Sequence, residues 1–130
     1  MKFIYPVIFR TVEDGFYAVS VPDLPGCFTQ GKDLQEAYEM AQDAIALWIC
    51  DSEDNSESIP LASDIHLMQH DENEFISLVS VDTTEYRAAI DNKAIKKTLT
   101  IPSWLNRAAE KQHLNFSQIL QEALKKKLHI

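Results

Sequence analysis

Two histidines near the middle of the chain have a spacing that could serve metal binding. His66 and His70 stand four residues apart among several acidic residues, and imidazole nitrogens and carboxylates are common ligands of divalent metals. A metal centre needs further ligands, and no third and fourth ligand recurs at a convincing spacing. A solvated loop is the favoured interpretation of this pair, so the sequence predicts neither a metal site nor a cofactor.

A second candidate site is the turn-rich segment around Pro25 and Gly26. Asp23 and Cys27 flank this dipeptide and carry an acid and a thiol. Turn residues usually serve backbone geometry, so a structural role is favoured for both. Together with Cys50 the chain has two cysteines, too few for a disulfide scaffold or a zinc site. We interpret both cysteines as reduced packing residues.

The composition is that of a globular protein. The chain has 130 residues, of which 45% are hydrophobic and 25% charged. No apolar run approaches the roughly 18 to 20 residues of a membrane-spanning helix. The first ten residues, which include Pro6 and Arg10, do not resemble a signal peptide. We therefore expect a cytoplasmic protein with no membrane association.

The charge is divided between the two parts of the chain. Residues 1–90 contain four Lys or Arg and 17 Asp or Glu, a formal charge of −13, whereas residues 91–130 contain eight basic and three acidic residues, a charge of +5. Binding depends on the local potential within a Debye length of roughly 8 to 10 Å. The division predicts two modules with oppositely charged partners, and the alternative is that both charge sets are solvated faces.

The N-terminal part predicts an α+β layer in which one helix covers one face of a sheet. Pro6 cannot donate to a ladder and suggests an edge or a bulge in the first strand. Asp33 and Glu36 have the spacing of a capping box at the start of the helix. The expected elements, in chain order, are a strand over 2–10, a hairpin turn at 13–15, strands over 16–21 and 27–30, a helix over 33–50, an acidic connection over 51–74 and a strand over 75–82.

The C-terminal part, residues 94–130, predicts a strand followed by two helices. It follows a domain over 1–86 and a linker over 87–93. In the strand over 95–101 apolar and polar residues alternate, Pro102 suits the first turn of a helix, and a second helix starts near 115–117. This part has 37 residues, and chains shorter than roughly 40 residues seldom form a stable core on their own. We therefore expect a dimer in which two such strands pair.

The segments IKKTLTIPSWL and NFSQILQEAL resemble the ribbon-helix-helix repressors, in which two chains contribute one strand each and two helices each. The resemblance implies that outward side chains of the strand touch base edges and that the start of the second helix binds a backbone phosphate. Phe116 departs from the family pattern, which often has a basic residue there. Either the phosphate contact is weaker or the Phe packs. Carried over by position, the DNA-binding residues are Lys96, Thr98, Thr100, Asn115 and Ser117.

The N-terminal part contains four short motifs: Tyr5-Pro6, Asp14-Gly15, Asp23-Leu24-Pro25-Gly26-Cys27 and Glu36-Ala37. In these motifs it resembles the HicB antitoxin domain. The resemblance implies a truncated ribonuclease-H-like fold, inhibition of a small basic HicA-like ribonuclease that cleaves mRNA, and repression of the protein's own operon. The acidic charge agrees with a module that covers a basic RNA-binding surface.

Two functions from different classes follow. The first is a type II antitoxin: a homodimer through residues 94–130 that inhibits a HicA-like toxin and binds operator DNA, with a tetramer left open. The second is a ribbon-helix-helix transcription regulator whose N-terminal domain senses a small ligand or only supports oligomerisation. We expect no enzyme activity, because a two-metal nuclease needs converging carboxylates and the strand over 2–10 contains neither Asp nor Glu.

Overall fold

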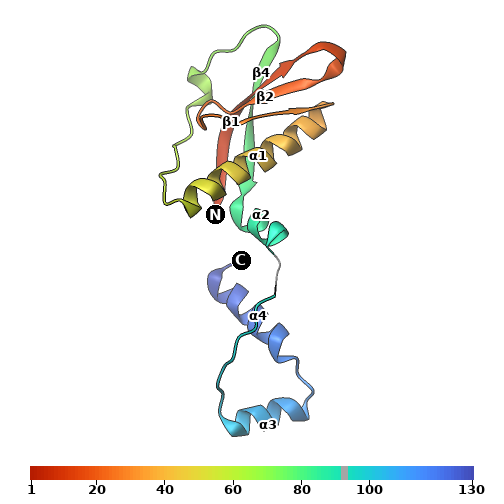
Figure 1. The fold of residues 1–130 in the computed structure, drawn as a ribbon, viewed down its shortest axis with the longest axis vertical. Helices are drawn as coiled ribbons and strands as arrows, with labels where there is room; N and C mark the ends of the chain where they lie inside the picture. Colours follow the sequence, from red (N-terminus) through yellow and green to blue (C-terminus); the bar gives the residue numbers. More distant parts are fainter. Residues whose placement is uncertain (92–93) are drawn as a thin grey trace. The chain divides into compact units, whose positions relative to one another are not determined.

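The computed structural model describes residues 1–91 and 94–130 and divides the chain into two compact units, Met1–Asn92 and Lys93–Ile130. The fold is mixed α/β, and its elements follow one another along the chain as in Figure 1. They are β1 (Lys2–Thr11), the short helix η1 (Glu13–Gly15), β2 (Tyr17–Ser20), β3 (Phe28–Gly31), α1 (Leu34–Asp54), η2 (Ile65–Leu67), β4 (Glu74–Asp82), α2 (Thr83–Ile90), α3 (Ser103–Lys111) and α4 (Phe116–Leu128).

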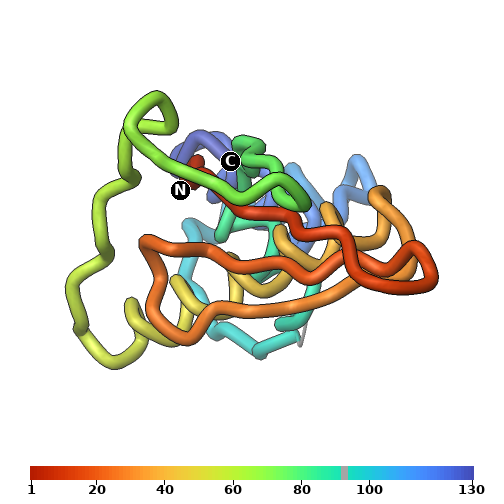
Figure 2. Tube along the Cα trace, turned by 90° about the horizontal axis from the view of Figure 1, so that it is seen from above, coloured from red at the N-terminus to blue at the C-terminus, as the bar shows by residue number. Residues whose placement is uncertain are grey.

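The first unit is a four-stranded antiparallel sheet with α1 packed on one face. The strand order is β3-β2-β1-β4, and Figure 2 shows the four strands side by side with the α1 helix behind them. Alternate residues of β1 face the helix, as the period of two in a strand requires. The predicted order of strands and helix is confirmed. The fully buried core residues are Tyr5, Val7, Phe9, Val19, Leu24, Ala37, Ala41, Ile45, Ile49 and Val79.

Pro6 lies in a strand that is central in the sheet. The expectation of an edge strand or a bulge is therefore wrong for the strand as a whole. Its physical reason, the missing N–H of proline, still applies next to Pro6. Pairing of β1 with β2 begins at Ile8, whereas pairing with β4 extends from Lys2 to Arg10. Beside Pro6 the strand has a sheet neighbour on one side, so the missing N–H disrupts no ladder.

Helix α1 starts where the sequence predicts. The Asp33 carboxylate accepts a hydrogen bond of 2.8 Å from the backbone N–H of Glu36. The expected return bond to the cap does not form, because the Glu36 carboxylate accepts instead from the N–H of Lys32, at 3.4 Å. The helix continues to Asp54, four residues beyond the predicted end, so the acidic connection begins within it.

The connection from α1 to β4 is hydrogen-bonded to the sheet and to the turn before β3. The Tyr5 hydroxyl donates to the backbone carbonyl of Pro60, at 2.5 Å. The Asp23 carboxylate accepts from both the backbone N–H and the hydroxyl of Ser63. The predicted structural role of Asp23 is confirmed, since it holds two turn-rich segments together.

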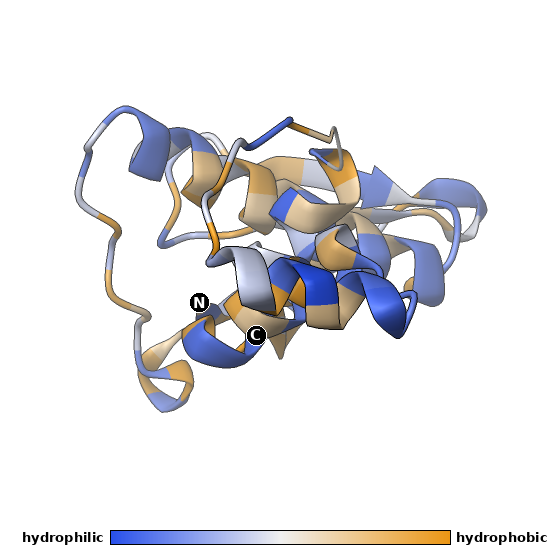
Figure 3. Cartoon of the chain, turned by 90° about the horizontal axis from the view of Figure 1, so that it is seen from below, coloured by the Kyte–Doolittle hydropathy of each residue, from blue (hydrophilic) through white to orange (hydrophobic). Residues whose placement is uncertain are grey.

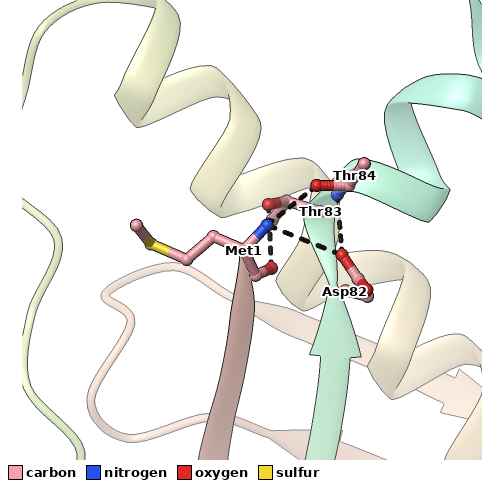
Figure 4. Close-up of polar contacts among 4 residues, drawn as sticks. All are labelled: Met1, Asp82, Thr83 and Thr84. Atoms are coloured by element: carbon pink, nitrogen blue, oxygen red, sulfur yellow. Dashed lines mark hydrogen bonds and ion pairs between the residues drawn. The ribbon is translucent and has the colours of Figure 1, made fainter. Parts of the chain in front are cut away.

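Helix α2 occupies much of the segment expected to be a linker. Residues 87–90 are helical, so the predicted boundary at residue 87 cuts through an element of the first unit. Asp82 accepts from the N–H of Thr84 at 2.9 Å, and Thr83 donates to the Met1 carbonyl (Figure 4). Arg87 donates to the Cys50 carbonyl and pairs with Asp54. These contacts join α2 to the end of α1.

The second unit contains α3 and α4, preceded by residues 94–102, which form neither helix nor strand. The predicted strand over 95–101 is therefore not present in the single chain. A strand is defined by its ladder partner, and the expected partner of this strand lies in a second copy of the chain. Among the described residues, no helix is long and apolar enough to cross a membrane.

Candidate nucleic-acid interface and acidic surface

The residues expected to touch base edges lie in the extended segment before α3. Lys96, Thr98 and Thr100 are all exposed. The apolar residues that alternate with them are exposed as well: Ile95 has 86% of its surface accessible and Leu99 57%. The single chain therefore leaves both sides of this segment uncovered and does not itself select one face for DNA.

The expected phosphate-binding residues meet at the start of α4. Asn115 is the N-cap residue, and its side-chain oxygen accepts from the N–H of Gln118 at 3.1 Å. Ser117 is exposed in the first turn, where the backbone N–H groups of a helix have no intrahelical partner and favour an anion. One acidic and one basic residue, Glu122 and Lys125, line the same hollow, so its formal charge is balanced.

The apolar side chains of the second unit lack a covering layer. In the described residues from 94 to 130, none is buried, and Asn106, Ala109 and Leu120 come nearest to it. Burying apolar surface is the main stabilising term in folding, and this unit gains little of it alone. Figure 3 shows the chain coloured by hydropathy. The exposed large apolar residues of the unit are Ile95, Leu99, Ile101, Trp104, Leu105, Leu114, Phe116, Ile119, Leu124, Leu128 and Ile130.

The first unit is strongly acidic, with a formal charge of −14 over Met1–Asn92 against +6 over Lys93–Ile130. A cleft of about 590 Å³ opens between α1, α2 and the paired ends of β1 and β4. Four carboxylates and one lysine line it. This surface suits a cationic partner because opposite potentials across an interface speed and orient association. The charged residues of the cleft are Lys2, Glu39, Asp43, Asp82 and Glu85.

The two cysteines of the first unit are structural residues. Burial raises the pKa of the Cys27 and Cys50 thiols, whereas a nucleophilic cysteine needs a lowered pKa. Both cysteines are free and buried, which confirms their interpretation as packing residues. In residues 1–91 and 94–130, no three His, Cys, Asp or Glu side chains gather as a metal site would require.

Helix α2 is the element of this surface that the sequence analysis missed. A signal for it exists: Asp82 and Glu85 have the spacing of an N-cap residue and the third residue of a capping box. No helix was expected between the strand over 75–82 and the linker over 87–93, whereas α2 covers Thr83–Ile90. The helix supplies Glu85 and Tyr86 to the acidic cleft.

Comparison with known proteins gives a family match over most of the chain. Residues 5–124 match the family described as "HicB_like antitoxin of bacterial toxin-antitoxin system". An uncharacterized 14.9 kDa protein from the rep-hol intergenic region of Haemophilus phage HP1 is 37% identical over 105 residues, which is 78% of this chain and 75% of that protein. Antitoxin HicB 1 of Photorhabdus laumondii is 46% identical over 57 residues, 44% of this chain and 37% of that protein.

Among solved structures, a toxin-antitoxin complex from Streptococcus pneumoniae contains a chain with the same fold. Its TM-score is 0.63 and its sequence identity 32%, and the match covers 98% of this chain and 99% of that chain. The similarity therefore extends over both units.

Proposed function

Because the chain belongs to the HicB-like antitoxin family of bacterial toxin-antitoxin systems, we propose that it binds and inhibits a HicA-like toxin that cleaves mRNA. The observation that carries this proposal is the −14 charge of the first unit. A ribonuclease that binds RNA presents a basic surface to phosphates. An acidic protein that occupies this surface competes directly with the RNA. The matched solved structure is a toxin-antitoxin complex, which agrees with this role.

The inhibition would need no catalytic group in the antitoxin. Cys27 and Cys50 are buried, and the Asp23 carboxylate accepts hydrogen bonds from Ser63. All three side chains therefore have structural roles. A rigid sheet covered by α1 provides a preorganised surface, which reduces the entropic cost of binding. The proposed mechanism is steric and electrostatic exclusion of RNA.

We further propose that the second unit forms a ribbon-helix-helix dimer that represses the operon. Pairing of two 95–101 segments would place Ile95, Leu99 and Ile101 against the apolar faces of α3 and α4, all now exposed. The same pairing would leave Lys96, Thr98 and Thr100 on the outer face toward DNA. For the first unit, the resemblance to the HicB antitoxin domain implies a truncated ribonuclease-H-like fold, which remains an expectation.

Co-expression tests the partnership. The chain is produced together with a candidate HicA-like protein, and a tag on one protein is used to purify both. We expect a stable complex, and we expect cells that express the HicA-like protein alone to stop growing. Two proteins that purify separately, with growth arrest unaffected by this chain, would refute the antitoxin proposal.

A further inference from the structure

Strand β4 forms one end of the sheet and carries a long uncharged outer edge. In the described residues it pairs with β1. Between Glu74 and Asp82 the strand reads FISLVSV, without a charge or a proline. Outer strands of this kind pair readily with a further strand, and natural proteins usually cover or charge them. The direction of the backbone groups decides what can pair there.

Pro6 determines that direction. It lies opposite Leu78 in the antiparallel ladder, and because proline has no N–H, the two cannot form a hydrogen-bonded pair. In the other kind of pair, both residues direct their N–H and C=O groups away from each other. Leu78 therefore directs its groups outward from the sheet, and the residues two positions away on either side, Ile76 and Ser80, do the same.

Two hydrogen bonds agree with this assignment and mark the limits of the free edge. The outward N–H of Glu74 donates to the Asp71 carbonyl at 3.1 Å. The outward carbonyl of Ser80 accepts from the side-chain amide of Gln42 on α1, at 2.9 Å. Between them, the N–H and C=O groups of Ile76 and Leu78 have no hydrogen-bond partner in the part of the chain that the structure describes.

These two donors and two acceptors are self-complementary. Consider a second copy of β4 that lies antiparallel to the first and is related to it by a two-fold axis through Ser77. Ile76 of each copy then lies opposite Leu78 of the other. Each of these pairs exchanges two N–H to C=O bonds. Leu78 is 50% exposed, so the same arrangement brings apolar side chains together across the axis.

The charges select the same register. With the axis at Ser77, Glu74 lies opposite Ser80 of the second copy. An axis at Leu78 would set Glu74 opposite Asp82 of the second copy, and like charges directly opposite destabilise a ladder. Hydrogen bonding and charge therefore favour one arrangement, centred on Ser77.

We propose that two copies of this chain join through antiparallel pairing of their β4 strands into one eight-stranded sheet. This interface is separate from the pairing proposed for residues 94–130. A chain with two different two-fold interfaces assembles beyond a dimer. The inference concerns assembly and does not rest on the antitoxin function.

A disulfide trap tests the register in the full-length chain. In the proposed dimer, Ser77→Cys places the new thiol of one copy opposite the same thiol of the second copy. The Cα atoms of such a non-hydrogen-bonded pair lie about 4.5 Å apart, within the range for a disulfide. We expect a covalent dimer after mild oxidation. Ser80→Cys is the matched control, because the two copies of residue 80 would lie about 20 Å apart along the ladder. Cross-linking of Ser77→Cys no faster than Ser80→Cys would overturn the proposal.

A second variant tests the interface without a thiol. Leu78→Lys puts a charge on each side of the axis while the side chain stays largely in solvent, so the fold is expected to persist. Light scattering should give the variant half the mass of the wild type. The same ratio is expected when both carry Leu99→Lys, which removes the other proposed interface. If Leu78→Lys and its parent have equal masses both with and without Leu99→Lys, self-pairing is contradicted. A Leu78→Lys variant that loses toxin binding but keeps its mass would contradict it as well.

Discussion

At the scale of single residues, Asp82 shows how one carboxylate joins two elements. It ends β4, caps α2 and lies 3.6 Å from the amino group of Met1. Burial acts to raise the pKa of Asp82, but the N–H of Thr84 and the amino group outweigh it, and the pKa lies below its ordinary value. The ionised form therefore stabilises the folded state.

This direction predicts a pH dependence for Asp82→Asn. A carboxyl group with a lowered pKa in the folded state contributes stability above its unfolded pKa of about 3.9, and loses it as the pH falls through the folded value. The variant should be less stable than the wild type at pH 7, with the difference shrinking toward pH 3. Urea unfolding at both values measures it, with Glu72→Gln as the control. A difference that does not change with pH would contradict the assignment.

Lys96 is the residue that tests the proposed DNA contact most directly. Lys96→Ala should weaken operator binding by roughly 5- to 150-fold, since a good base contact contributes about 1 to 3 kcal/mol. The dimer should persist, because the side chain is exposed. Fluorescence anisotropy with operator DNA measures the affinity, and Lys111→Ala is the matched control on α3. Unchanged binding by Lys96→Ala would remove this residue from the interface.

At the scale of elements, β3 and α1 approach each other closely at Gly31. Gly31 lies against Ala37, and a Cβ at Gly31 would be 2.9 Å from the Ala37 Cβ and nearer still to its backbone. Real Cβ atoms do not approach so closely, so the helix would have to move. The glycine thus determines how near the helix lies to the sheet.

Gly31→Ala should therefore destabilise the first unit by about 1 to 3 kcal/mol, the usual cost of overpacking. Equilibrium unfolding in urea measures the loss. Gln30→Ala, an exposed neighbour on the same strand, should stay within about 0.5 kcal/mol of the wild type. Equal stability of the two variants would show that α1 adjusts freely.

Leu99 tests the proposed pairing of the second unit. Leu99→Lys puts a charge where the proposal has an apolar side chain facing a second copy, and it should abolish that pairing and all specific DNA binding. Thr98→Lys, on the opposite side of the segment, should leave the pairing intact. Size exclusion with light scattering compares them, and a Leu99→Lys chain that pairs through residues 94–130 would refute the ribbon.

The elements that could be predicted from the sequence are those specified by local signals. The turn at Asp14 and Gly15, both with positive φ, and the cap at Asp33 act within a few residues. The strand over 95–101 could not be observed in one chain, because its expected partner lies in another. Pro6 was placed at an edge because the sequence does not reveal that pairing with β2 starts two residues later.

At the scale of the whole molecule, the chain joins two units of opposite charge and different self-sufficiency. The first has a buried core and the −14 charge, and the second has exposed apolar faces and a +6 charge. The acidic unit is complete before it meets a partner, whereas the basic unit needs another chain to bury its apolar surface. This difference supports the proposal that the first unit binds the toxin and that the second unit pairs through residues 94–130 and binds DNA.

The most direct test of this account is a titration of the toxin's ribonuclease activity with the full-length chain at low and high salt. We predict stoichiometric inhibition of RNA cleavage at low salt, with affinity that falls as salt screens the acidic surface. Lys96→Ala should inhibit as well as the wild type, because its charge lies in the second unit. Cleavage that continues in the presence of excess chain would contradict the account.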